Sequence, residues 1–138
     1  MSSTDNPEIE IISDKDQILT YIIRARHLPT STQFITPPEY KQQVGYVVYP
    51  AGGEVARHTH RPLQRHLEGT SEVLLVKKGV CLLDVYNDAH DLVGTRQLSE
   101  GDLILMVSGG HGLRILEDTV LLEIKQGPYT GLDEKERF

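Results

Sequence analysis

Short runs in which apolar and polar residues alternate follow one another along most of the chain. Alternation with a period of two is typical of β-strands with one buried face, whereas the spacing that marks an amphipathic helix is almost absent. Glycine-rich turns separate the runs at regular intervals, so we expect an all-β sandwich or barrel of about ten short strands. From residue 43 onward, strands are expected at residues 44–49, 54–60, 72–76, 80–86, 92–98, 103–107, 113–116 and 120–125.

The N-terminal part of the chain has a less regular pattern. Residues 8–12 alternate and are expected to form an edge strand that ends in a turn rich in Ser and Asp. Residues 18–24 are rich in Ile and Tyr, which favours a strand, with a short helix beginning at Ser13 as the alternative. Prolines interrupt residues 28–40, which are expected to be mostly loop with a brief strand at residues 33–35.

A short link separates two of the expected strands. Residues 72–76 and 80–86 are apolar runs joined by Lys77, Lys78 and Gly79. Two strand-like runs joined by a short link that contains glycine are typical of a β-hairpin. The sequence therefore predicts that these two strands pair with each other.

Composition narrows the class of protein. The 138 residues, 38% hydrophobic and 25% charged, fit one globular domain with a substantial core. A net charge of −6 argues against a nucleic-acid partner, which requires a basic face. No apolar run approaches the ~20 residues of a membrane span, and the polar first residues do not suggest a signal peptide. The single cysteine, Cys81, is expected to be a buried thiol, and these features together favour a cytoplasmic protein.

A pair of histidines carries the clearest chemical signal. In an extended strand, His58 and His60 would point to the same face, about 6.6 Å apart. Imidazole is the commonest metal ligand in proteins near neutral pH. Glu72, at the start of the next expected strand, is placed to add a carboxylate. The alternative is two surface histidines in a loop.

One set of glycine, histidine and glutamate positions resembles the first motif of the cupin superfamily. These positions are Gly52, His58, His60, Glu72 and Gly79. Residues 101–111, GDLILMVSGGH, are similar to the second cupin motif, in which a glycine precedes a strand, a turn and a histidine. The resemblance covers about residues 43–126. It implies one cupin domain over residues 1–138, that is, a double-stranded β-helix or jelly-roll barrel with one metal at its mouth.

The resemblance also implies a ligand set. Its members are His58, His60, Glu72 and His111. Three nitrogen donors and one oxygen donor suit a divalent first-row transition metal and argue against Mg and Ca, which prefer oxygen. An octahedral centre would keep two positions for water or substrate. The donor set leaves Fe, Mn, Ni, Zn and Co as alternatives.

His66 is a rival to this set, because it lies in the loop that follows the histidine pair. It is a candidate either to replace His58 as a ligand or to act as an acid–base group. Glu72 is the second candidate catalytic residue, since it would be the obvious base if it does not bind the metal.

Four further residues are candidates for substrate binding: Arg57, Arg61, Arg65 and Tyr46. Guanidinium groups match the oxygens of carboxylate and phosphate groups, so the arginines suggest an anionic substrate. The alternative is that they belong to a solvated loop. The hydroxyl of Tyr46 is expected at the rim of the barrel.

The C-terminal residues suggest a class of reaction. Residues 121–137 resemble the strand and tail that close the cupin part of bacterial mannose-6-phosphate isomerases, and small cupins among polysaccharide sugar enzymes have a similar Gly-Pro-Tyr ending. This favours a sugar isomerase or epimerase, in which a metal polarises a carbonyl group while a base moves a proton. An Fe(II)-dependent dioxygenase and a non-catalytic binding protein for small molecules are the alternatives, because one fold hosts all three. Residues 133–137 are expected to form a charged turn or short helix.

Strand edges with unpaired backbone groups favour association between copies of a chain. We therefore expect a homodimer, with residues 9–12 and 18–23 at its interface.

Overall fold

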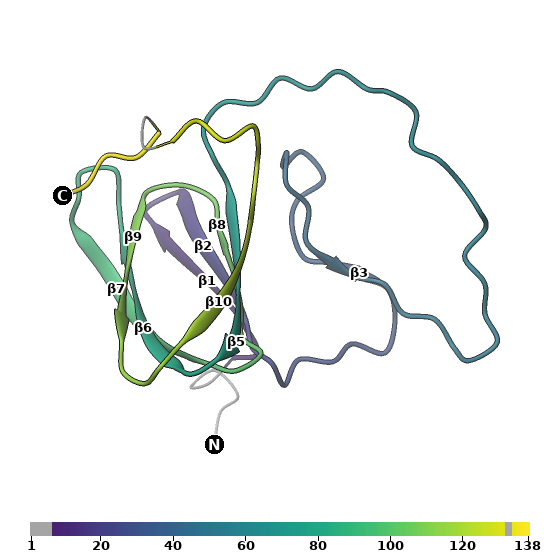
Figure 1. Ribbon diagram of the computed structural model, residues 1–138, viewed down its shortest axis with the longest axis horizontal. Coiled ribbons are helices and arrows are strands. Elements are labelled where there is room, and N and C mark those ends of the chain that lie inside the picture. The colour runs from purple at the N-terminus through teal and green to yellow at the C-terminus, as the bar shows by residue number, and fades with distance from the viewer. Residues whose placement is uncertain (1–6, 132–133) are drawn as a thin grey trace. The chain divides into compact units, whose positions relative to one another are not determined.

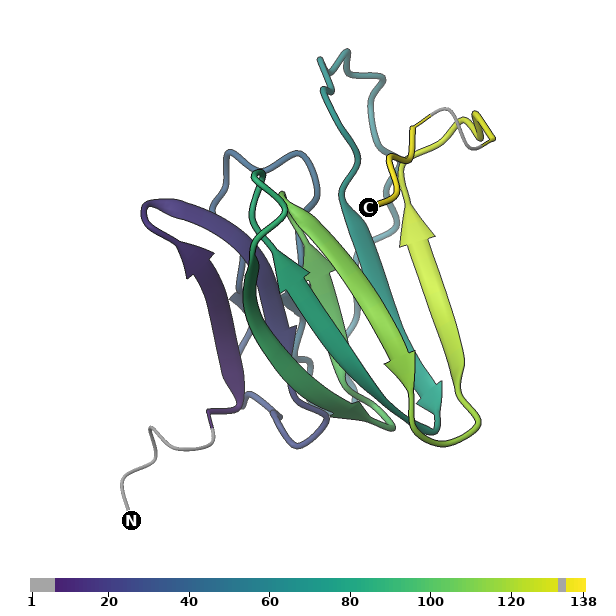
Figure 2. The same ribbon diagram turned by 90° about the vertical axis from the view of Figure 1, so that its left-hand side faces the viewer.

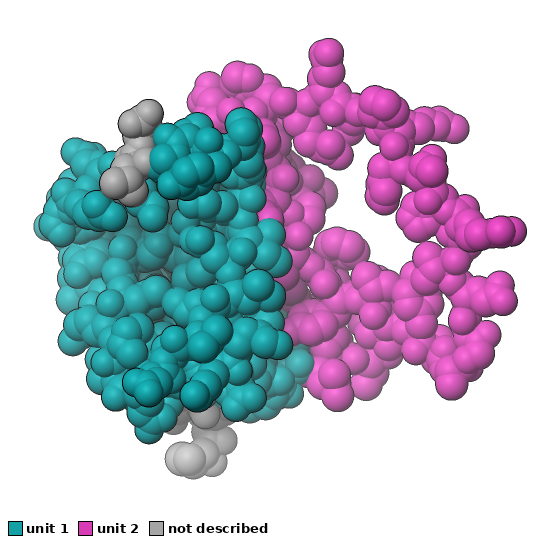
Figure 3. Space-filling view, in the orientation of Figure 1, with its two compact units in different colours: residues 1–27, 70–138 teal, residues 28–69 magenta. Residues whose placement is uncertain are grey.

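The computed structural model describes residues 7–131 and 134–138. These residues form ten β-strands and no helix, which confirms the all-β prediction. Within them, no helix is long and apolar enough to span a membrane. The chain divides into two compact units (Figure 3). Of the described residues, 7–27, 70–131 and 134–138 belong to unit 1, and 28–69 belong to unit 2.

Unit 1 consists of two antiparallel sheets (Figures 1 and 2). The larger sheet contains, in spatial order, β1 (Ile9–Asp14), β2 (Gln17–Ile23), β8 (Leu103–Met106), β5 (Glu72–Lys78) and β10 (Val120–Lys125). The smaller sheet contains β7 (Leu92–Ser99), β6 (Val80–Tyr86) and β9 (Gly110–Ile115).

The two sheets enclose one apolar core. In β6, Cys81, Leu83 and Val85 are completely buried, and Ile22 and Ile104 of the larger sheet belong to the same cluster. Burial of the Cys81 thiol agrees with the sequence prediction. Burying apolar surface stabilises a fold by roughly 25 cal/mol per Å², so these facing side chains hold the sheets together.

The predicted hairpin of residues 72–76 and 80–86 is wrong. Strand β5 pairs with β8 and β10, whereas β6 pairs with β7 and β9 of the other sheet. Gly79, between them, has a φ angle of 99°, a conformation that glycine adopts without strain. The chain crosses at this glycine from one sheet to the other. A short link with glycine fits both a hairpin and a crossing, so the local pattern does not distinguish them.

The N-terminal strands form a hairpin, and the helix alternative for residues 18–24 is excluded. Strands β1 and β2 pair in register from Ile9 opposite Ile23 to Asp14 opposite Gln17. Strand β2 also pairs with β8, so both of its edges are used within the chain. The homodimer stays a prediction, and strand pairing through this hairpin would have to use the edge of β1.

Two of the predicted elements lie in the C-terminal part of the chain. Strand β9 begins at Gly110, so His111 lies within a strand and not at the end of a turn. The strand predicted at residues 113–116 is observed at Gly110–Ile115, so it begins and ends earlier than predicted. The charged turn or helix predicted at residues 133–137 lies partly outside the described residues, and residues 134–138 form no helix.

Unit 2 contains one short two-stranded sheet, in which β3 (Gln33–Phe34) pairs with β4 (Gly45–Tyr46). The link between the strands is held by Gln43. Its side-chain amide donates hydrogen bonds to the carbonyl oxygens of Pro37 at 2.9 Å and Tyr40 at 2.8 Å. Strand β3 confirms the brief strand predicted at residues 33–35.

The strand predicted at residues 54–60 is wrong, because these residues belong to no strand, and the one predicted at residues 44–49 is confined to β4. Val55 and Ala56 are the apolar side chains of residues 54–60, and Val55 is exposed. Pairing this segment would bury little apolar surface to offset the entropy lost on ordering it. Residues 61–71 are loop, as predicted.

Candidate functional site

Glu72 and His111 come together at one end of unit 1. Glu72 is the first residue of β5, and His111 is the second residue of β9. In the strand register, Glu72 lies opposite Lys125 of β10, and His111 lies opposite Val85 of β6. Val85 points into the core, so the same face of β9 directs His111 between the two sheets.

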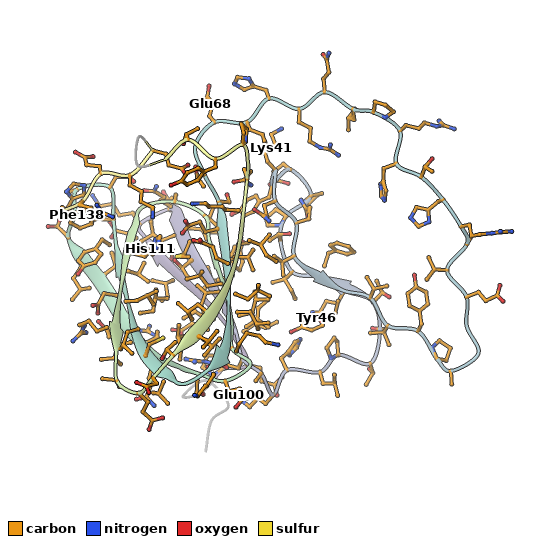
Figure 4. The ribbon with its side chains drawn as sticks, viewed as in Figure 1. Lys41, Tyr46, Glu68, Glu100, His111 and Phe138 are labelled. Atoms are coloured by element: carbon orange, nitrogen blue, oxygen red, sulfur yellow. The ribbon has the colours of Figure 1, made fainter. Side chains whose placement is uncertain are left out.

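The two side chains are in direct contact. Nε2 of His111 lies 3.2 Å from Oε2 of Glu72, and the side chains are 33% and 12% exposed. Figure 4 labels His111 in unit 1, away from Glu100 at the opposite end of the unit. From these exposed fractions, the imidazole of His111 is partly open to solvent, whereas the carboxylate of Glu72 is largely enclosed. Such a pair can share a proton or present nitrogen and oxygen donors to a cation.

The surroundings of Glu72 lower the pKa of its carboxyl group below the usual value of 4.5. The largest cause is the hydrogen bond with His111. A hydrogen bond with Glu123 and the electrostatic attraction of His111 and Lys125 act in the same direction, whereas burial opposes them by disfavouring the charged form. The carboxylate is therefore ionised near neutral pH, which is the form that binds a cation or accepts a proton.

The lowered pKa of Glu72 predicts how its contribution to stability depends on pH. The ionised group stabilises the folded state above pH 4.5, and this contribution is lost as the pH falls through the folded-state pKa, which lies lower. We expect Glu72→Gln to reduce the free energy of unfolding by about 1–2 kcal/mol at pH 6, with a difference that narrows toward pH 3. Urea denaturation of both proteins between pH 3 and pH 6 measures this difference in the free energy of unfolding. A difference that does not change with pH would contradict the assignment.

His58 and His60 lie in unit 2, outside the strands. Their ring centroids are 5.2 Å apart, so the two imidazoles are neighbours even without the predicted strand. Nδ1 of His58 lies 2.7 Å from the carbonyl oxygen of Ala56. A carbonyl oxygen only accepts hydrogen bonds, so Nδ1 carries the hydrogen and Nε2 of the neutral ring keeps a lone pair. Metal-binding histidines are commonly held in this way.

The other predicted site residues of unit 2 differ in their exposure to solvent. Nε2 of His66 lies 3.0 Å from Oε1 of Glu68, and both side chains are strongly exposed. Burial raises the pKa of the Tyr46 phenol, which therefore stays protonated near neutral pH. The three candidate anion-binding arginines are exposed: Arg57, Arg61 and Arg65. This exposure agrees with a solvated loop and with an anion-binding role alike.

The predicted ligand set is divided between the units. His58 and His60 belong to unit 2, whereas Glu72 and His111 belong to unit 1. Across residues 7–131 and 134–138, no three side chains of His, Cys, Asp or Glu are gathered in a group that could hold a metal ion. The contact that the fold creates between predicted ligands of different strands is the one between Glu72 and His111.

Two charged residues beside Glu72 were not among the predicted site residues. Glu123 and Lys125 lie on β10, and both affect the pKa of Glu72. They alternate with outward-facing positions and share a face with Leu121, which packs against the core. The alternation of the sequence points the other way, because it makes Leu122 and Ile124 the apolar face, yet these two side chains are 49% and 52% exposed. The alternation also did not indicate that β10 lies next to β5.

An open surface pocket of about 700 Å³ lies at the same end of unit 1, between the turns that join β1 to β2 and β6 to β7. Its lining includes four aspartates: Asp14, Asp16, Asp88 and Asp91. Nε2 of Gln17 donates hydrogen bonds to Oδ2 of Asp88 and to Oγ of Ser108, each at 3.0 Å. A wall rich in carboxylates does not suit an anionic substrate, so this pocket is not the predicted anion site.

No family model matches the chain, and neither a curated protein nor a solved structure is significantly similar to it.

Proposed function

We propose that unit 1 is a cupin-type jelly roll, a double-stranded β-helix, and that the chain binds one divalent transition metal ion. The proposed ligands are His58, His60, Glu72 and His111. The observation that carries the proposal is the distance of 3.2 Å between His111 Nε2 and Glu72 Oε2. Strands β5 and β9 belong to different sheets, yet they bring two of the proposed ligands into contact. The five and three antiparallel strands of the facing sheets match the eight strands of a double-sheet jelly roll.

The chemistry of the donors fits a first-row transition metal. Imidazole nitrogen suits Fe, Ni and Zn, and an ionised carboxylate adds charge without a proton to displace. Glu72 is ionised near neutral pH because its pKa is lowered. For His58 and His60 the support is the sequence motif, the 5.2 Å between their rings and the Nδ1 contact that leaves the His58 Nε2 lone pair available.

We infer a small polar substrate of anionic or sugar type and isomerase or epimerase chemistry. A bound metal would supply Lewis-acid polarisation of a carbonyl group. Glu72, if it is not a ligand, is the base, and His66 is the other candidate acid–base group. Lys125, on the strand beside Glu72, adds a positive charge that favours an anionic substrate.

The metal content of the purified protein tests the proposal. Protein prepared without a metal-affinity tag is expected to contain about one equivalent of a transition metal by elemental analysis. We expect His58→Ala and His111→Ala each to weaken metal binding on the order of 100-fold, because each removes a ligand. His66→Ala separates the two possible ligand sets: it is expected to keep the metal if His58 is the ligand, and loss of the metal would favour His66 instead. Protein that neither contains nor takes up a transition metal at neutral pH would rule out the metal site.

The identity of the metal separates the alternatives. Zinc or manganese would favour the isomerase or epimerase, whereas iron together with oxygen consumption would favour a dioxygenase. If metal binds but no candidate sugar or anion is converted, the non-catalytic binding protein becomes the leading function.

A further inference from the structure

Residues 134–138 run across the end of unit 1 that contains Glu72 and His111 (Figures 1 and 4). This segment contacts the rest of unit 1 at two anchors, one through Glu134 and one through Phe138. The first anchor lies beside Glu72 and the second beside His111.

Glu134 forms the first anchor. Its Oε2 accepts a hydrogen bond from Oγ1 of Thr70 at 2.7 Å, and its Oε1 lies 3.6 Å from Nζ of Lys125. Lys125 lies opposite Glu72 in the register of β5 and β10, and Thr70 comes two residues before Glu72. The carboxylate of Glu134 therefore forms an ion pair with the lysine that lies opposite Glu72.

Phe138 forms the second anchor. Its ring stacks on His90, with centroids 3.8 Å apart and planes 5° from parallel, and meets Tyr86 edge to face at 5.1 Å. The ring also lies directly on Gly110, where a Cβ atom would stand 2.9 Å from Phe138 Cζ. A side chain at position 110 would therefore displace the ring. Gly110 immediately precedes His111 in the chain.

We propose that residues 134–138 are a strap across the Glu72–His111 end of unit 1, and that its opening speeds the access of a ligand to His111, which is 33% exposed with the strap in place. The proposal concerns access to the site and rests on the proposed function only for the identity of the ligand. Five residues can span up to about 17 Å, which lets the segment reach from one anchor to the other across this end. Both anchors are weak enough to open, because the first consists of one exposed hydrogen bond and one ion pair, and Phe138 is 62% exposed.

Chemical modification of His111 tests the strap without any metal or substrate. The rate at which diethyl pyrocarbonate modifies His111 is measured by peptide mass spectrometry on metal-free protein, with the exposed His66 as internal reference. Phe138→Ala and Glu134→Gln each remove one anchor, and we expect about a five-fold faster reaction of His111 with no change at His66. An unchanged rate at His111 in both variants would overturn the proposal.

A pair of glycine variants on β9 provides a matched control. Gly110→Ala should displace the Phe138 ring and accelerate modification of His111 as Phe138→Ala does. Gly112→Ala lies on the other side of His111, where a Cβ meets no atom within 4 Å, and should leave the rate unchanged. Equal rates in the two glycine variants would contradict a strap held through Phe138. If the strap variants accelerate modification but the protein binds no metal, the strap stands and the proposed metal site fails.

Discussion

Replacing Asp102 with alanine is expected to lower the free energy of unfolding by about 3 kcal/mol. Asp102 is buried in the turn between β7 and β8. Its carboxylate accepts hydrogen bonds from the backbone N–H groups of Ala25 at 3.0 Å and Ser99 at 2.9 Å, and from Nη1 of Arg24 at 3.0 Å. It therefore ties the end of β2 to the turn that returns the chain to the larger sheet. Alanine would leave two backbone donors and a guanidinium group without this acceptor.

Urea denaturation at neutral pH measures the effect of Asp102→Ala, and two variants make it specific. Glu100→Ala changes an exposed carboxylate of the same turn and is expected to alter stability by less than about 0.5 kcal/mol. Asp102→Asn keeps an acceptor oxygen but loses the charge opposite Arg24, so its effect should lie between the two. If Asp102→Ala is as stable as Glu100→Ala, the proposed role of this carboxylate in joining β2 to the turn is wrong.

Gly79→Ala is expected to destabilise the fold by about 3 kcal/mol, because it combines backbone strain with overlap of atoms. Gly79 has a φ angle of 99°, which side-chain-bearing residues rarely adopt. A Cβ atom there would overlap the carbonyl oxygen of Asp118 and stand 2.5 Å from Oγ1 of Thr119. The turn between β9 and β10 thus packs directly against the crossing from β5 to β6.

Gly131→Ala separates the two causes of the Gly79 effect. Gly131 also has a positive φ angle, 76°, but a Cβ atom there meets no atom of residues 7–131 and 134–138 within 4 Å. We expect Gly131→Ala to lower the free energy of unfolding by about 1 kcal/mol or less, as backbone strain alone would. Equal losses in the two variants, measured by urea denaturation, would show that packing against Asp118 and Thr119 does not contribute.

Local alternation predicted several strands closely, and it also predicted one strand, at residues 54–60, that does not form. Strands β6 and β10 begin and end where the sequence pattern predicts, and in β6 the inward side chains are apolar enough to mark the buried face. Residues 54–60 also alternate, but with polar side chains at most positions, and they form no strand. Alternation therefore indicates a strand only where one of the two faces has apolar surface to bury.

The candidate site could be predicted from the sequence only in part. The spacing of His58 and His60 was sufficient to predict neighbouring imidazoles, since two positions separated by one residue are close in any extended chain. The contact between Glu72 and His111 was suggested by the cupin resemblance and not by the spacing of the two residues. Lys125 and Glu123 were missed, because nothing local to β10 indicates which strand lies beside it.

Local sequence patterns were enough to predict that this chain is a β-protein, where most of its strands and turns lie, and that Cys81 is buried. These properties depend on the backbone conformation and burial preferences of residues close together in the chain. The tertiary structure alone decided the strand order, the crossing at Gly79 and the meeting of Glu72, Lys125 and His111. Strand order depends on which apolar faces can bury one another, and those faces come from residues far apart in the chain.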